Sequence, residues 1–135
     1  MRIIVLAAVL LFMSSASFAQ ISKFQTESMC YKEKSDEGTW TSWSDWMAFD
    51  LKIHIDFDND RVYVFSDDKR TFKISEYLPE EIDGDGDSVY EFICVDADGV
   101  SCRIRLMILK TNDNKIQFYI DYFNYMFAYN VILLE

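Results

Sequence analysis

The chain has 135 residues, of which half are hydrophobic, 16% are aromatic and 27% are charged, and its formal net charge is −10. This composition is too apolar for a disordered protein, and four glycines and one proline exclude collagen-like and proline-rich classes. Thirteen basic residues face 23 acidic ones, so we expect neither nucleic acid nor an anionic membrane to be the main partner.

The first 19 residues are typical of a secretory signal peptide. Arg2 supplies a positive start, an apolar run of eleven residues follows, and Ser17 and Ala19 fit a small-residue cleavage site. A membrane anchor is the alternative, but the run is shorter than the roughly 20 residues that cross a bilayer. No later segment is long or apolar enough to span one. We therefore predict an exported, soluble protein, periplasmic or secreted, with a single domain over residues 20–135.

Beyond this leader, apolar and polar residues alternate with the period of two that is typical of strands. Residues 21–33 form a weak strand candidate, and residues 35–45 are expected to be a loop or a short helix. The alternation is strongest over residues 49–57. A turn centred on Asn59 and Asp60 places Phe57 opposite Val62, Ile55 opposite Val64, and Asp58 opposite Arg61.

The turn at residues 67–69 then predicts that Val62 and Val64 face Ile74 and Phe72. The clearest hairpin follows, because Ala97-Asp98-Gly99 fits a three-residue loop with glycine in the left-handed position. This loop sets four facing pairs: Cys94 with Cys102, Phe92 with Ile104, Tyr90 with Leu106, and Glu91 with Arg105.

A final hairpin is expected over residues 116–134. A tight turn at Phe123-Asn124 buries more apolar surface than the register shifted by one residue. The preferred register has four facing pairs: Tyr122 with Tyr125, Ile120 with Phe127, Phe118 with Tyr129, and Ile116 with Val131.

Together these segments predict an all-β domain, an antiparallel meander of seven or eight short strands. Because edge strands must be closed or covered, we favour a small barrel over a two-sheet sandwich. Gly38-Thr39-Trp40 resembles the G-x-W tripeptide near the first strand of lipocalins, which are ligand-binding barrels. This resemblance covers three residues and implies a lipocalin-like barrel shape. It implies nothing about the ligand.

The three cysteines are an odd number for an exported chain. Because Cys94 and Cys102 face each other, we predict a cross-strand disulfide between them. Cys30 is then left as a buried small hydrophobe or as a partner in an intermolecular bond. The alternative is three buried thiols.

Catalytic motifs are missing from the sequence. The chain has a single histidine, His54, which excludes the usual zinc sites with several histidine ligands. His54 lies on the polar side of its strand. The chain also has no C-x-x-C, phosphate loop or nucleophile elbow. We therefore predict no enzyme and no cofactor. A hydrolase that uses two carboxylates is kept as a second alternative.

The acidic excess is concentrated in residues 56–98, which hold fourteen acidic and four basic residues. Asp83, Asp85 and Asp87 match the alternating ligand positions of an EF-hand loop, which makes them a weak calcium candidate. Ser88 and Cys94 then stand where that loop needs glycine and glutamate. A second acidic set, at residues 56, 58 and 60, lacks glycine altogether. The alternative for both sets is a solvated turn that protects sheet edges.

The aromatic residues cluster in two places, before the strongest strand and in the final hairpin. We predict an exported, non-enzymatic binding or interaction protein that acts through an aromatic-lined surface or cavity. Its partner is an unknown small apolar ligand or a protein. The first alternative is a calcium-stabilised structural envelope protein, and a purely structural role of the rings is also open. The candidate ligand-binding residues are Trp40, Trp43, Trp46, Tyr119, Tyr122 and Tyr125.

Overall fold

The computed structural model describes residues 21–134, so the predicted leader lies outside the described residues. Within residues 21–134 no helix is long and apolar enough to cross a membrane. The described chain consists of strands joined by turns and loops. The strands are β1 (Ile21–Glu33), β2 (Met47–Ala48), β3 (Lys52–Asp56), β4 (Arg61–Phe65), β5 (Arg70–Tyr77), β6 (Glu81–Ile82), β7 (Ser88–Asp96), β8 (Ser101–Leu109), β9 (Lys115–Asp121) and β10 (Tyr125–Leu134).

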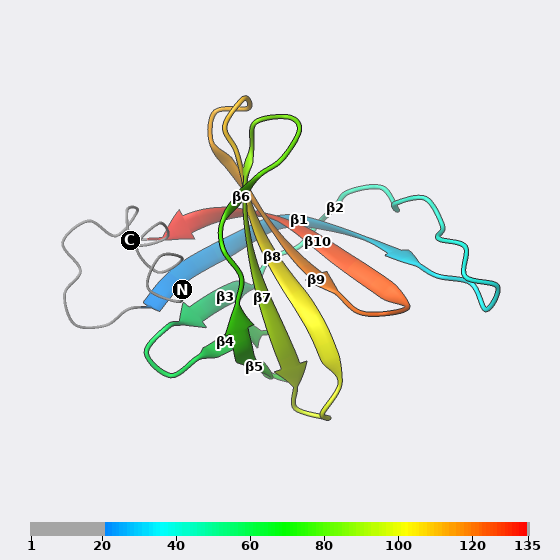
Figure 1. The fold of residues 1–135 in the computed structure, drawn as a ribbon, viewed down its shortest axis with the longest axis horizontal. Coiled ribbons are helices and arrows are strands. Elements are labelled where there is room, and N and C mark those ends of the chain that lie inside the picture. The colour runs from blue at the N-terminus through cyan, green and yellow to red at the C-terminus, as the bar shows by residue number, and fades with distance from the viewer. Residues whose placement is uncertain (1–20, 135) are drawn as a thin grey trace.

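Eight of these strands close into an antiparallel barrel, as Figure 1 shows. They follow the order β1-β3-β4-β5-β7-β8-β9-β10, and β10 pairs with β1 to complete the ring. The two-residue strands β2 and β6 pair with the sides of β1 and β7. The predicted meander and small barrel are confirmed, and the sandwich alternative is wrong because β1 and β10 leave no open edge.

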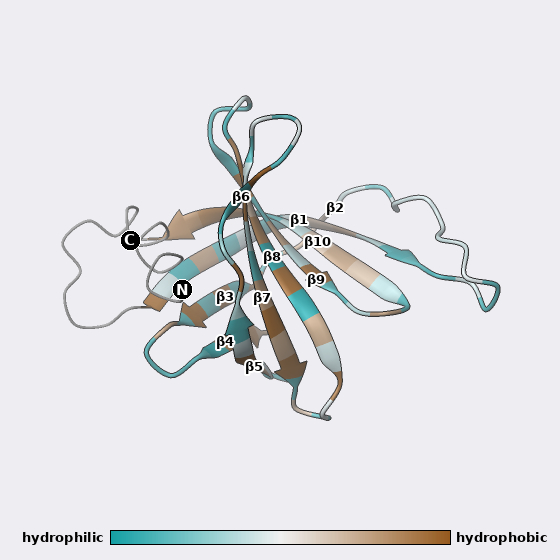
Figure 2. Cartoon of the chain, viewed as in Figure 1, coloured by the Kyte–Doolittle hydropathy of each residue, from teal (hydrophilic) through white to brown (hydrophobic). Residues whose placement is uncertain are grey.

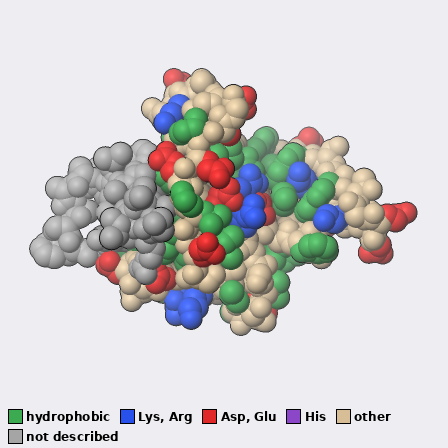
Figure 3. Space-filling model, viewed as in Figure 1, with side chains coloured by type: hydrophobic (Ala, Val, Ile, Leu, Met, Phe, Trp, Pro, Cys, Tyr) green, Lys and Arg blue, Asp and Glu red, His purple; other side chains and the backbone are tan. Residues whose placement is uncertain are grey.

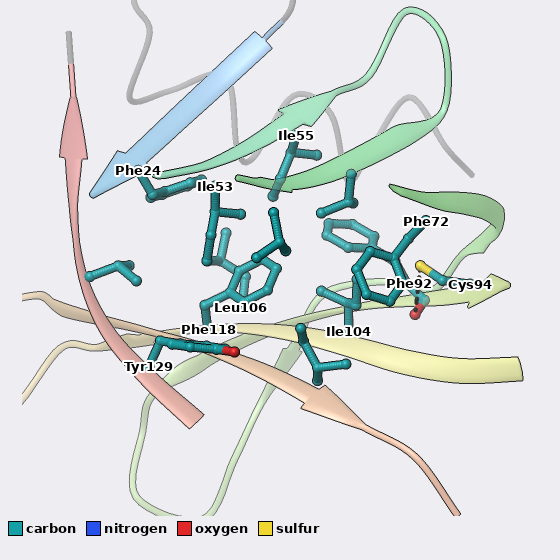
Figure 4. Packing of buried hydrophobic residues seen from close by; sticks show 14 of the residues in the cluster. Phe24, Ile53, Ile55, Phe72, Phe92, Cys94, Ile104, Leu106, Phe118 and Tyr129 are labelled. Carbon is teal, nitrogen blue, oxygen red and sulfur yellow. Dashed lines mark hydrogen bonds between the residues drawn. The ribbon is translucent and has the colours of Figure 1, made fainter. Parts of the chain in front are cut away.

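Side chains fill the barrel interior. Figure 2 shows hydrophobic residues along the strands and hydrophilic ones in the connecting turns. Residues from opposite walls, such as Ile53 and Phe118, point toward each other in Figure 4, and both have 0% exposure. An eight-stranded barrel is just wide enough for side chains to fill it. Five phenylalanines contribute most of the volume: Phe24, Phe57, Phe72, Phe92 and Phe118.

The two hairpins in the second half of the chain have the predicted registers. Cys94 faces Cys102 and Phe92 faces Ile104 across β7 and β8, and Gly99 has a φ of 82° in the turn. In β9 and β10, Phe118 faces Tyr129 as expected. These turns are defined by a left-handed glycine or by large aromatic residues that fit only one register.

The predicted registers of the two earlier hairpins are wrong by two residues. Val62 faces Ile55 instead of Phe57, and it faces Phe72 instead of Ile74. Each turn is centred one residue earlier than expected. Asp56, which faces Arg61, explains the first, because its carboxylate accepts hydrogen bonds from the backbone and side-chain amides of Asn59 at 3.2 and 2.9 Å. A two-residue shift keeps every side chain on its face, so the predicted core is unchanged.

The predicted disulfide between Cys94 and Cys102 is wrong, although the two residues face each other as expected. Both residues, and Cys30, are buried free thiols. The Cys94 thiol lies 3.7 Å from the carbonyl oxygen of Phe92 on its own strand. Burial raises the pKa of Cys94 and raises that of Cys102 to about 11, so both groups are protonated at neutral pH and poorly nucleophilic.

Alkylation of the purified protein in denaturant should therefore modify three thiols per chain without any reductant. The native protein should react slowly at all three, because each sulfur is buried and protonated. Intact mass spectrometry counts the added groups. A denatured product with a single added group, rising to three after reduction, would show that the bridge exists.

Candidate binding surface

A bulge in β1 turns a row of lysines outward. Before the bulge Phe24 points into the barrel, and after it Met29 does, so the inward positions change from even to odd numbers. The register shift lies between Thr26 and Ser28. Without it, Lys32 would follow Phe24 into the core. The bulge therefore places Lys32 on the outside of the barrel.

The segment that follows β1 folds back along the free edge of that strand, as Figure 1 shows. The backbone amide of Ser44 donates to the carbonyl of Tyr31, and that of Thr41 donates to the carbonyl of Glu33, both at 2.8 Å. The hydroxyl oxygens of Ser44 and Thr41 accept the returning bonds from β1 at 3.0 Å. The segment is an irregular loop, not the short helix that was the other expectation. These bonds fix the position of Trp43 between the two anchors.

Two small residues lie beneath this loop on the outer face. Cys30, Ala128, Tyr119 and Arg105 face one another in turn across β1, β10, β9 and β8. This row points outward, because the neighbouring row contains the inward Ile104. Cys30 and Ala128 are nevertheless only 3% and 1% exposed. The outer face is therefore covered at this point, and its small side chains leave room for large rings above them.

The rings and cations of this face form one continuous series, which we call the cation–aromatic ladder. Rings and cations alternate along it except where Trp43 contacts Tyr119 directly. Figure 3 shows hydrophobic and basic side chains interspersed on this face, although the chain as a whole is acidic. Three of its members, at positions 40, 43 and 119, belong to the predicted set, and the other four were not predicted. In spatial order the ladder consists of Phe123, Lys34, Trp40, Lys32, Trp43, Tyr119 and Arg105.

Each lysine of the ladder lies near two rings. The Nζ atom of Lys34 is 4.4 Å from the ring centre of Phe123 and 5.2 Å from that of Trp40. The Nζ atom of Lys32 is 5.3 Å from the ring centre of Trp40 and 4.7 Å from that of Trp43. Cations within about 6 Å of a ring centre are attracted to the ring face. These contacts hold the two ammonium groups close to the rings.

Tyr119 is held in place by ring contacts and by a hydrogen bond. Its ring packs edge-on against Trp43 at 6.1 Å and under the Arg105 guanidinium at 4.2 Å. Its hydroxyl donates a 2.9 Å bond to Gln117, whose amide donates to Asn130 at 3.0 Å. Burial raises the pKa of Tyr119, so the phenol stays neutral and keeps this donor role at physiological pH.

Two ion pairs lie at the Arg105 end of the ladder, and one of them includes Arg105 itself. Arg105 binds both carboxylate oxygens of Asp121, with Nε–Oδ2 at 2.5 Å and NH2–Oδ1 at 3.1 Å. The Arg103 guanidinium lies 3.2 Å from the Glu91 carboxylate. Within residues 21–134 no ion pair includes Lys32 or Lys34. The two lysine charges are therefore the ones left available to a ligand.

An open depression of about 370 Å³ adjoins the ladder. Arg103, Asp121 and Met126 line it from the outer face of β8, β9 and β10, and Tyr122 and Phe123 line it from the turn. Phe123 belongs to both the depression and the ladder, and it is 83% exposed. The outer surface therefore has a continuous path from the rings into a hollow.

The other three predicted ligand-binding residues lie away from the ladder. Trp46 is 46% exposed on the returning loop, and no contact joins it to the ladder rings in the described chain. Tyr122 and Tyr125 stack at 4.7 Å at one end of the barrel. The Tyr122 hydroxyl donates to Asp96 at 2.8 Å and accepts from Arg70 at 3.2 Å, so this pair helps to close the barrel. Burial and the Asp96 contact raise the pKa of Tyr122.

The calcium candidate lies in a turn capped by the carboxylate of Asp83, and the turn at Asp96 has the same hydrogen-bond pattern. The ligand atoms of Asp83, Asp85 and Asp87 lie within 4.8 Å of one another. One oxygen of Asp83 accepts the amides of residues 85 and 87 at 2.9 and 3.0 Å, and Asp96 does the same for residues 98 and 100, at 2.9 Å each. Asp83 therefore has a sufficient structural role as a turn residue. Calcium binding stays a prediction.

His54 lies on the outer face of the barrel, as its position on the polar side of the strand indicated. Its ring packs edge-on against Phe65 with ring centres 4.6 Å apart. Burial and the nearby charges of Lys23, Lys52 and Lys69 lower its pKa, so the ring is neutral at pH 7. No nucleophile or carboxylate is hydrogen-bonded to it among the described residues.

No protein family, curated protein or solved structure shows a significant match to this chain.

Proposed function

We propose that this protein is an exported, non-enzymatic binding protein that holds its ligand or partner on the cation–aromatic ladder. The leader in the sequence supports export, and the missing catalytic motifs support binding without chemistry. The single observation that carries the proposal is the alternation of partly exposed rings with lysines on a covered outer face.

The packing of the barrel supports the outer face over the interior as the site. Five phenylalanines less than 3% exposed occupy the interior, whereas Trp43 is 39% exposed on the outside. Backbone hydrogen bonds hold the returning loop in place before any ligand arrives. A pre-organised aromatic surface loses little conformational entropy on binding, which favours affinity.

The test is a printed array of oligosaccharides and short peptides, probed with labelled protein. The double variant W40A/W43A should lose signal on every feature that wild type binds. Phe65→Ala is the matched control, since Phe65 is 37% exposed but lies on β4, outside the ladder. Far-UV circular dichroism checks that both variants keep the β-sheet. If W40A/W43A still binds the probes that wild type binds while Phe65→Ala does not, the proposal is wrong. It is also wrong if wild type binds no probe on the array.

A further inference from the structure

We propose that the ladder recognises an acidic polysaccharide, a chain of sugar rings that carry carboxylates. This inference rests on the proposed function and names its ligand class. Sugar rings present flat C–H faces that pack on aromatic rings, and an acidic sugar adds one negative charge to each ring unit. A ligand that repeats a flat apolar face and an anion therefore matches a surface that repeats an aromatic ring and a cation.

The cations of the ladder are available for this role, because the acidic excess of the chain is concentrated in residues 56–98 and every ladder residue lies outside that range. Within residues 21–134 Lys32 and Lys34 form no ion pair, while Arg103 and Arg105 are paired to carboxylates. Each lysine Nζ lies between two rings, at 4.4 to 5.3 Å from the ring centres. When a sugar ring packs on those aromatic rings, the carboxylate that it carries lies near an ammonium group. The two can then form a charge-assisted hydrogen bond.

The rim of the ladder favours a sugar over a nucleic acid. Asp121 and Glu91 flank the rings, and both carboxylates can only accept hydrogen bonds. Sugar hydroxyls donate to such groups, whereas a phosphodiester backbone offers acceptors alone. A ligand with both hydroxyl donors and separate carboxylates satisfies the rim and the lysines together.

The depression beside Phe123 gives the chain a second point of contact. The depression has a volume of about 370 Å³ and adjoins Phe123, the ring at one end of the ladder, and Arg103, Asp121 and Ser101 provide polar groups within it. A sugar unit that continues past Phe123 enters a hollow that offers both hydrogen-bond donors and acceptors. The site therefore fits a short linear oligosaccharide better than a single sugar.

Isothermal titration calorimetry with four six-unit probes tests this inference: oligogalacturonate, maltohexaose, hexaglutamate and hexathymidylate. Wild type should bind oligogalacturonate, and K32Q/K34Q should weaken that binding by about tenfold or more, because it removes two charge-assisted contacts. The control K110Q/K115Q removes two exposed lysines near the β8–β9 turn, away from the ladder, and should stay within about twofold of wild type.

The remaining outcomes overturn the inference in distinguishable ways. Equal binding of maltohexaose, lost in W40A/W43A, would keep the proposed function and remove the acidic class. Binding of hexaglutamate without either sugar would identify an acidic protein segment as the partner, and binding of hexathymidylate alone would identify a nucleic acid. If none of the four probes binds, the assignment of an acidic glycan is overturned. The proposed function is tested separately by the binding of W40A/W43A to the array.

Discussion

Phe118→Ala should lower the free energy of unfolding by about 3–5 kcal/mol, the range for removing a fully buried phenylalanine. Phe118 has 0% exposure on β9, and its ring lies 6.4 Å from that of Tyr129, the facing residue on the neighbouring strand β10. The barrel is closed on every side by hydrogen-bonded strands, so its wall has little freedom to collapse into the cavity. A site that relaxes poorly lies at the upper end of the range.

Urea denaturation followed by circular dichroism measures this change. Phe123→Ala is the control from the same hairpin, because Phe123 is 83% exposed and its truncation should change stability by about 0.5 kcal/mol or less. Phe118→Leu should cost less than Phe118→Ala, since leucine fills part of the cavity. Equal losses for Phe118→Ala and Phe123→Ala would show that the interior is not packed as described.

The barrel was predictable from the sequence because its strands alternate so strongly. The central inward positions of residues 88–96 are apolar, as are all inward positions of residues 101–109, and Gly99 fixes the turn between the two strands. The registers at residues 57–61 and 66–69 were wrong because an Asp-rich turn can be centred on several residues. Side-chain hydrogen bonds, such as those of Asp56 to Asn59, select the centre, and sequence alternation does not reveal them.

The binding surface was only half predictable for a related reason. Aromatic clustering singled out Trp40, Trp43 and Tyr119, but nothing in the sequence separated them from Tyr122 and Tyr125, which help to close the barrel. Lys32 was missed because an uninterrupted strand would turn it inward with Phe24. The bulge that reverses this depends on pairing with β10, which lies about a hundred residues away in the sequence.

The two Asp-capped turns allow one tertiary hydrogen bond to be measured. Asp83→Ala and Asp96→Ala each remove a carboxylate oxygen that accepts two backbone amides. Asp96 also accepts the Tyr122 hydroxyl at 2.8 Å, and Tyr122 in turn accepts from Arg70. Asp96→Ala should therefore be more destabilising than Asp83→Ala by about 1.5–3 kcal/mol, the contribution of a hydrogen bond to a charged group.

Urea denaturation with EDTA present excludes any effect of a bound cation at Asp83. Tyr122→Phe provides the second arm, because it removes the hydroxyl and leaves the turn bonds of Asp96 intact. In the double variant D96A/Y122F the losses should be less than additive, since both changes break the same contact. Full additivity would mean that Asp96 stabilises its turn and does not help to close the barrel.

The pH dependence separates the same two roles. Burial raises the pKa of Asp96, but the amides of residues 100 and 98, the Tyr122 hydroxyl and Arg70 together outweigh it and leave the pKa lowered. A carboxyl whose pKa is lower in the folded state stabilises the protein above its unfolded pKa of about 3.9, and this stabilisation is lost as the pH falls through the folded value. The gap between wild type and Asp96→Ala should thus be full at pH 7 and shrink below about pH 4. A gap that stayed constant to pH 2 would show that the contact does not depend on the charge of Asp96, and that Tyr122 is held mainly by its stack on Tyr125.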